Sequence, residues 1–147
     1  MLLMRSERVR AGRARDAVSC ARILNDWIDA TPWMPRIHTH QGVRQYFQDI
    51  MFPQQQIFVI GRPVSGFLAL TADDLIAALY VSKPGQGLGR KLLSHCKSMR
   101  VRLRLWTFEQ NQAAQRFYLR EGFSETRRTD GDNEEKLPDI LYEWSRE

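Results

Sequence analysis

The chain has 147 residues, of which 43% are hydrophobic and 27% charged, and its formal net charge is +5. This length favours one domain over residues 1–147, and no segment approaches the roughly 20 apolar residues that span a membrane. The basic side chains are mostly scattered, which argues against a nucleic-acid interface. The N-terminal segment lacks the apolar core of a signal peptide, so we expect a cytoplasmic protein.

The first third of the chain predicts a short strand and two helices. Arg8–Ala11 is a plausible strand, and Asp16 is placed to cap a helix running to about Ala30. The segment Thr31–Pro35 interrupts the helical pattern because each of its prolines disfavours helix at the preceding residue. Thr39 is placed to cap a second helix, which we expect Pro53 to end.

The remainder of the chain alternates strand and helix patterns. Apolar runs between turn residues predict strands at Gln56–Gly61, Ser65–Thr71, Leu75–Val81, Val101–Thr107, Phe123–Arg127 and Ile140–Trp144. One helix is expected after the glycine-rich turn, and another between a capping Asn111 and Gly122. The element order βααβββαβαββ therefore predicts an α/β domain with a mixed sheet.

The cysteines and histidines carry no clear catalytic or metal pattern. Cys20 and Cys96 lie among apolar residues in predicted helices and have no redox or zinc spacing, so we expect buried, reduced thiols. His38 and His40 stand two apart in a loop without a further ligand cluster, which favours solvated side chains over a metal site.

The turn Lys83–Arg90 is the clearest candidate for a ligand site. A strand ends at Val81 and a helix begins near Gly87 or Leu88, so unpaired backbone N–H groups and the positive end of the helix dipole face one point. Glycines allow the backbone to approach an anion closely, and Arg90 adds positive charge. The turn is therefore expected to hold phosphate groups.

Two common phosphate motifs do not fit this turn. A P-loop needs Ser or Thr after its lysine, whereas Lys91 is followed by Leu92. A dinucleotide fingerprint needs a third glycine where Leu92 stands, and it belongs after the first strand of a longer parallel sheet.

A known family shares both this turn and a second motif. Leu79-Tyr80-Val81 followed by Gly85-Gln86-Gly87-Leu88-Gly89-Arg90 resembles the acetyl-CoA loop of the GNAT N-acetyltransferases. The segment Leu105–Phe123 is similar to that family's second motif, in which Asn, Ala, Phe-Tyr and Gly-Phe follow one another. The resemblance implies a GNAT fold with a mixed, mostly antiparallel sheet, and acetyl-CoA as cofactor.

The resemblance also implies roles for individual residues. Backbone amides of Gln86–Arg90 would hold the pyrophosphate, and Leu79–Val81 would splay from the next strand, pair with the pantetheine arm and polarise the thioester carbonyl. Asn111 would contact the cofactor arm, and Tyr118 would be the general acid near the sulfur. The implied cofactor contacts are Leu79, Tyr80, Val81, Gly85, Gln86, Gly87, Leu88, Gly89, Arg90, Asn111 and Tyr118.

Tyr118 also suits the acid role chemically. A tyrosine with a pKa near ~10 can donate a proton to a thiolate whose conjugate acid resembles cysteine, with a pKa near ~8.5. The alternative is a tyrosine packed on the apolar face of its helix, and the two interpretations are compatible.

Two features depart from the family pattern. Pro84 replaces the family's Arg or Gln before the first glycine and offers no N–H, and the connection from Val81 to Gly85 is short. The strand Leu75–Val81 also lacks the Glu that serves many relatives as base. Asp73 and Asp74 lie in the preceding turn, which favours solvated turn formers over a base. The other candidates for base or substrate contact are Glu109, Glu134, Glu135 and Asp139.

By the same resemblance, an acceptor pocket lies between the first two helices and the last hairpin. The candidate substrate contacts are Trp33, Met34, Glu109 and Tyr142, with Trp144 beside them. Packing of these large side chains on the core is the alternative.

The sequence supports one function above two others. We expect an N-acetyltransferase that moves an acetyl group from acetyl-CoA to a primary amine by direct attack in a ternary complex. A GNAT fold that binds acyl-CoA without catalysis is the alternative, and nucleic-acid binding is the third hypothesis. The acceptor, a small-molecule or peptide amine, is left open, as is a homodimer.

Overall fold

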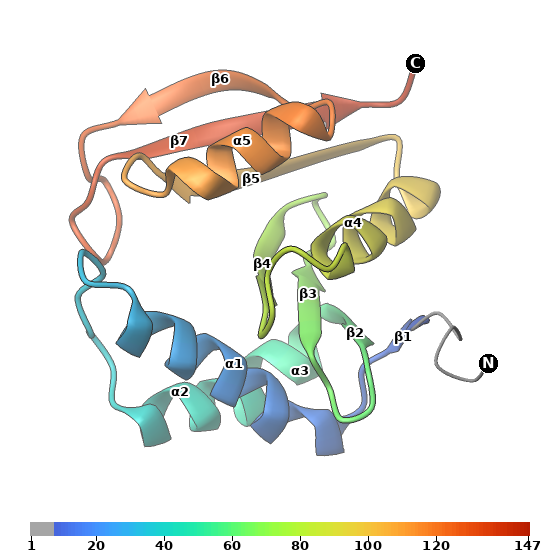
Figure 1. Ribbon diagram of the computed structural model, residues 1–147, viewed down its shortest axis with the longest axis vertical. Coiled ribbons are helices and arrows are strands. Elements are labelled where there is room, and N and C mark those ends of the chain that lie inside the picture. Colours follow the sequence, from blue (N-terminus) through green and yellow to red (C-terminus); the bar gives the residue numbers. More distant parts are fainter. Residues whose placement is uncertain (1–7) are drawn as a thin grey trace.

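The computed structural model describes residues 8–147, in which helices flank two separate sheets (Figure 1). The strands are β1 (Val9–Ala11), β2 (Gln56–Ile60), β3 (Gly66–Leu70), β4 (Ile76–Val81), β5 (Arg102–Phe108), β6 (Ser124–Thr129) and β7 (Asp139–Ser145). The α-helices are α1 (Ala17–Ala30), α2 (His40–Tyr46), α3 (Phe52–Gln54), α4 (Leu88–Met99) and α5 (Gln112–Arg120). Apart from the short α3, the order of the strands and α-helices is the predicted one, and the fold is α/β.

The first sheet is antiparallel in the order β1-β2-β3-β4, and both of its faces are covered. Alternate residues of β2 and β3 point to opposite faces. Val59 and Phe67 pack with α1 and α2, whereas Ile60 and Leu68 pack with α4. Coverage on both sides explains why β2 and β3 read as nearly continuous apolar runs.

The second sheet has the order β5-β7-β6 and is also antiparallel. Leu103 and Leu105 of β5 join Tyr142 of β7 in the same core cluster as α4, so one apolar core continues from the first sheet to the second. Arg102 and Arg104 alternate with these leucines on the more exposed side, as the sequence pattern predicts.

The two sheets meet at one end of β4 and β5 and separate beyond it. Among residues 8–147 their only bridge is the parallel pair Leu75 and Arg104, next to which the N–H of Arg104 donates to the carbonyl of Asp74 at 3.0 Å. Ion pairs brace this end: Asp74 with Arg100 at 2.9 Å, and Asp73 with Arg104 at 2.8 Å. The two aspartates therefore fasten the closed end of a V-shaped opening.

Two local predictions need correction. Asp16 is the N-cap residue of α1, but its side chain makes no capping hydrogen bond, because its carboxylate pairs with Arg10 at 3.1 Å and accepts the Arg13 N–H at 2.8 Å. Pro53 does not end the second helix, since a π-helical stretch, η3 (Phe47–Met51), continues into α3. The helical segment then ends at Gln54, one residue after Pro53.

The helix caps at Thr39 and Asn111 are confirmed. The Thr39 hydroxyl accepts the Gly42 N–H at 2.9 Å, and the Asn111 side chain accepts the Ala114 N–H at 3.1 Å. Cys20 and Cys96 are buried free thiols, and burial raises the pKa of each to about 12. No helix in residues 8–147 is long and apolar enough to cross a membrane.

Candidate active site

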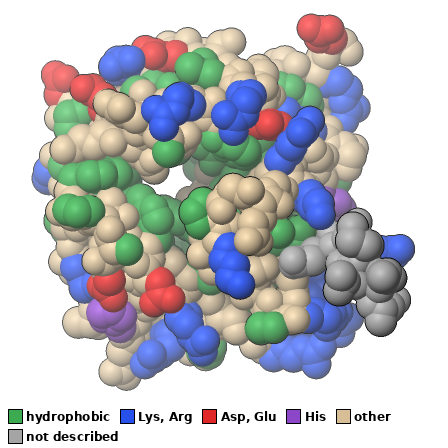
Figure 2. All heavy atoms as spheres, in the orientation of Figure 1, with side chains coloured by type: hydrophobic (Ala, Val, Ile, Leu, Met, Phe, Trp, Pro, Cys, Tyr) green, Lys and Arg blue, Asp and Glu red, His purple; other side chains and the backbone are tan. Residues whose placement is uncertain are grey.

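The opening between β4 and β5 contains two adjacent cavities. A narrow one of about 90 Å³, here called the slot, lies against Leu79, Asn111 and Tyr118. A wider one of about 880 Å³, here called the large cavity, extends toward α1, α2 and the loop before β7. They share the wall residues Ala77, Ala78, Tyr80, Trp106, Thr107 and Phe108. Figure 2 shows the hollow at the centre of the molecule, bordered by hydrophobic side chains.

The glycine-rich turn connects β4 to α4. Gly85 and Gly87 have φ values of +83° and +76°, a left-handed conformation that other residues adopt only with strain. Gly87 is the N-cap residue of α4, where no side chain accepts a hydrogen bond from the first turn. The turn 82–87 is exposed, so backbone donors and the positive helix end face open space. Arg90 is exposed nearby, 3.8 Å from Glu121.

Asn111 and Tyr118 of the second motif both reach the slot, one at the start of α5 and one two turns later. Asn111 uses its side-chain oxygen to cap α5. That leaves its NH₂ group as the donor for a ligand.

Tyr118 is 7% exposed and belongs to the core cluster, and it also lines the slot. The side chain is therefore packed in the core and next to a cavity at the same time. Its ring packs edge-on against Phe117 and Phe123, with centroids 5.0 and 5.5 Å away. Burial raises the pKa of Tyr118, with a smaller contribution from Tyr80. The hydroxyl therefore stays protonated through the neutral range, where it is available as a donor.

The strand β4 lies along both cavities. Leu79 lines the slot, and Tyr80 lines the slot and the large cavity, whereas Val81 lines neither and packs against the core. The Tyr80 ring lies 5.2 Å from that of Trp27, and its pKa is raised to about 12 by burial and, less strongly, by Glu135.

The predicted acceptor-side residues are only partly brought together. Met34 lines the large cavity. Trp33 lines neither cavity and packs against Trp27 and Phe108, with centroids 5.8 and 5.9 Å away. Tyr142 is buried in the core at 2% exposure, because it faces the same side of its sheet as Leu105, and it lines neither cavity.

The candidate carboxylates differ in their partners. Asp73 and Asp74 belong to the ion pairs at the closed end, and Glu109 lies outside both cavities, 3.4 Å from Arg128. Glu134 and Asp139 line the large cavity, but each has a partner: His38 at 2.9 Å for Glu134, Asn133 at 3.0 Å for Asp139. Glu135 lines the large cavity and makes no hydrogen bond or ion pair with any residue from 8 to 147.

Several residues that line the two cavities were not predicted from the sequence. Thr107 and Phe108 end β5 beside the second motif, and their position next to Asn111 was the available signal. Tyr46 and Gln55 flank the π-helical stretch, and nothing in their sequence neighbourhood marks them. His40 pairs with Asp29 at 2.7 Å, and residues 8–147 contain no group of three or more metal-type ligands.

Comparison with known proteins identifies the family. The model of the acetyltransferase (GNAT) domain matches residues 53–125, which include the slot strands, the glycine-rich turn and the second motif. The chain belongs to the GNAT family. No curated protein matches this GNAT chain by sequence.

Solved structures share the GNAT fold over nearly their full length. YjaB of Escherichia coli, in its apo form, is 23% identical with a TM-score of 0.78, covering 97% of this chain and 99% of its own. YncA of Salmonella typhimurium, with its cofactor acetyl-CoA, is 18% identical with a TM-score of 0.72, covering 97% and 95%. PaiA N-acetyltransferase of Thermoplasma acidophilum, in complex with coenzyme A, is 16% identical with a TM-score of 0.69, covering 95% and 99%.

Proposed function

We propose that this protein transfers an acetyl group from acetyl-CoA to a primary amine by direct attack in a ternary complex. The observation that carries the proposal is the shared wall between the slot and the large cavity. A thioester carbonyl placed at that wall would be open to a cofactor arm from one side and to an amine from the other. Acetyl-CoA is the cofactor of the family, and this arrangement gives it and an acceptor separate entrances.

In this proposal the pyrophosphate lies on the backbone of Gln86–Arg90, at the open start of α4. The pantetheine arm follows Leu79–Val81 through the slot and contacts the amide of Asn111. Pro84 supplies no N–H, so donors from Gln86 onward carry the phosphate contacts.

The chemical step asks two things of the protein. The backbone near Tyr80 and Val81 stabilises the negative charge that develops on the carbonyl oxygen. Tyr118, protonated and next to the slot, donates to the departing sulfur.

The alternative is a GNAT module that binds acyl-CoA without catalysis. Pro84 in the phosphate turn and the lack of a carboxylate on β4 favour it. Release of free thiol from acetyl-CoA in the presence of a panel of amines separates the two functions. Thiol release that depends on an amine supports the transferase, whereas calorimetric binding of acetyl-CoA with no release supports the module. No binding at all would contradict both.

A further inference from the structure

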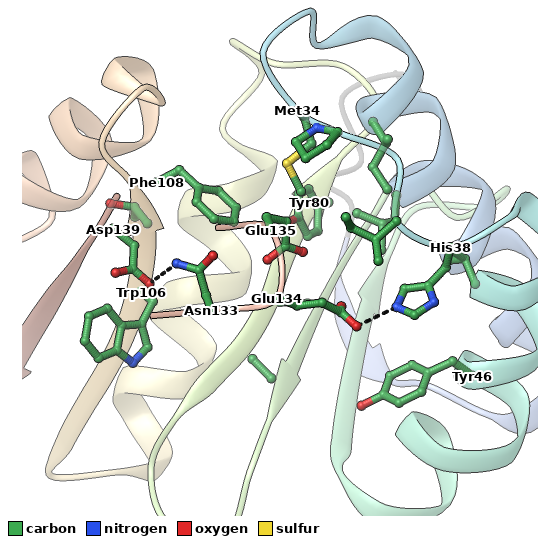
Figure 3. A pocket seen from close by; sticks show the side chains of 18 of the residues that line it. Met34, His38, Tyr46, Tyr80, Trp106, Phe108, Asn133, Glu134, Glu135 and Asp139 are labelled. Carbon is green, nitrogen blue, oxygen red and sulfur yellow. Dashed lines mark hydrogen bonds and ion pairs between the residues drawn. The ribbon is translucent and has the colours of Figure 1, made fainter. Parts of the chain in front are cut away.

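The large cavity has an apolar side and an acidic side. On the side formed by α1, the loop after it and the helical segment 40–54, most lining side chains are apolar: Leu24, Ile28, Met34, Ile37, Val43, Phe47 and Met51. Tyr46 and Gln55 add polar groups there. The loop before β7 supplies the carboxylates of Asp132, Glu134 and Glu135, and the first residue of β7 supplies that of Asp139. Figure 3 shows the side chains of Glu134 and Glu135 extending into the space between the helices and β5. A ligand that satisfies both sides has an apolar body and a positive charge.

Glu135 is the carboxylate best placed to receive that charge. It is half-buried, without a partner among residues 8–147, and close enough to Tyr80 to raise the pKa of that phenol. Tyr80, the near neighbour of Glu135 that Figure 3 also labels, belongs to the wall shared with the slot. An ammonium group paired with Glu135 would thus lie near the wall that the slot and the large cavity share.

Thr107 offers a second polar group at the same wall. Its residue is 7% exposed, and its Oγ1 is buried without a hydrogen-bond partner in residues 8–147. Buried hydroxyls are rarely left unpaired, because the lost hydration costs about 1–3 kcal/mol. Because Thr107 lines both cavities, this hydroxyl is a candidate acceptor for the N–H groups of an amine bound at their shared wall.

The basic side chains of the cavity do not balance its carboxylates. Among residues 8–147 they are His38, which pairs with Glu134, and Arg127, which is exposed and lies 5.8 Å over the Trp106 ring. A carboxylate on the ligand would therefore face several carboxylates of the protein at close range, which is unfavourable.

We infer that the acceptor is a small primary amine with an apolar body and no carboxylate, whose nitrogen is held by Glu135 and Thr107. This inference rests on the proposed transferase function. Glu135 takes one proton from the ammonium group and passes it to solvent. The neutral nitrogen attacks the thioester carbon, the C–N bond forms and the C–S bond breaks. Tyr118 protonates the departing sulfur, and the second proton of the nitrogen restores the phenol, so the products are the amide, the free thiol of CoA and one released proton.

Three matched amines test the acceptor class by thiol release: 2-phenylethylamine, phenylalaninamide and phenylalanine. The amide has almost the shape of the amino acid without its negative charge. We expect kcat/KM for phenylalanine to fall at least about tenfold below the other two, from repulsion between like charges. Equal or faster turnover of phenylalanine would overturn the inference while leaving the transferase intact. A short peptide amide beginning with phenylalanine should be slower than phenylalaninamide, and faster turnover would overturn the small-molecule assignment.

Variants test the two named residues. Glu135→Gln keeps the side-chain size and should lower kcat for 2-phenylethylamine by about 10²-fold, with its dependence on pH changed. In this variant, kcat/KM for phenylalanine should also lie closer to the values for the other two amines. Asp130→Asn removes one charge from the same loop outside the cavity. It should leave both kcat for 2-phenylethylamine and the preference against phenylalanine unchanged. Thr107→Val should lower turnover without lowering the melting temperature, because it removes an unpaired hydroxyl. Wild-type kinetics in Glu135→Gln would overturn the inference.

Absence of thiol release with every amine would contradict the proposed function instead. Calorimetric titration with 2-phenylethylamine then tests whether the large cavity binds the amine in the absence of catalysis. Binding that weakens in Glu135→Gln and not in Asp130→Asn would support the amine site without catalysis, and no binding would reject it.

Discussion

The side-chain oxygen of Asn111 accepts the N–H of Ala114 at 3.1 Å, while the same asparagine lines the slot. One residue thus starts a helix with its oxygen and presents its NH₂ group to the proposed cofactor arm. The two roles use different atoms and can be separated by substitution.

Asn111→Ala should lower the free energy of unfolding by about 1 kcal/mol, because α5 loses its cap. Asn111→Asp keeps a capping oxygen and should retain stability, but it replaces the NH₂ donor with a negative charge. We expect both variants to bind acetyl-CoA more weakly, with only the first less stable in urea. Full affinity in Asn111→Asp would contradict the contact with the cofactor arm.

Tyr118→Phe should separate chemistry from cofactor binding. The ring keeps its packing against Phe117 and Phe123, so the melting temperature should change little. Loss of the hydroxyl should reduce kcat by about 10²-fold, the usual contribution of a proton donor, while the affinity for acetyl-CoA persists. Steady-state rates and calorimetry on the same preparation provide the comparison. Unchanged kcat would show that the sulfur takes its proton from another group.

Gly87→Ala should be costly although there is room for the methyl group. No atom lies within 4 Å of the Cβ position, but the φ of +76° imposes a strain of roughly 1–2 kcal/mol on alanine. We expect lower stability in urea and weaker binding of acetyl-CoA. Gly89→Ala is the control, because its φ is helical and its Cβ would make an ordinary contact of 3.5 Å with Phe117. A Gly87→Ala protein as stable as Gly89→Ala would refute the left-handed turn.

Acid should weaken the fold through Asp16. Burial raises its pKa, but the hydrogen bonds from Arg10 and from the Arg13 backbone lower it more, so the pKa lies below its ordinary value of 3.8. A carboxyl with a lowered native pKa stabilises the fold fully above its unfolded pKa, and this stabilisation is lost as the pH falls through the native value. Asp16→Asn should therefore cost about 1–2 kcal/mol at pH 7 and less at a pH well below 3.8. Urea titrations at both pH values measure the difference, and a constant difference would argue against the ion pair with Arg10.

Local signals predicted the fold well because they are strong in this chain. Apolar runs bounded by turns located the strands, and Thr39 and Asn111 marked the helix starts. The side-chain cap predicted for Asp16 is absent because its carboxylate pairs with Arg10. The helix end predicted at Pro53 is wrong because a π-helical stretch, with a different backbone hydrogen-bond pattern, precedes that proline. Neither effect is visible in local propensity.

The site was predictable where it coincides with short motifs and less so where it depends on packing. The slot residues Leu79, Asn111 and Tyr118 come from two compact segments. The walls of the large cavity come from several distant elements. Gln55 therefore carried no sequence signal, Thr107 carried only its position beside the second motif, and Tyr142 fell on the buried side of its strand. Which cavity carboxylate lacks a partner depends on contacts such as that of Glu134 with His38.

The separation of β4 from β5 has a consequence for the protein without ligand. Past the bridge at Leu75 and Arg104, two strand edges face each other across the slot, although neighbouring strands in a protein usually pair. A pantetheine arm lying between them would act as a surrogate strand, with its amides taking up backbone groups that no neighbouring strand satisfies. A bound cofactor would therefore complete the pairing of both strand edges, and its departure would leave the two edges unpaired again.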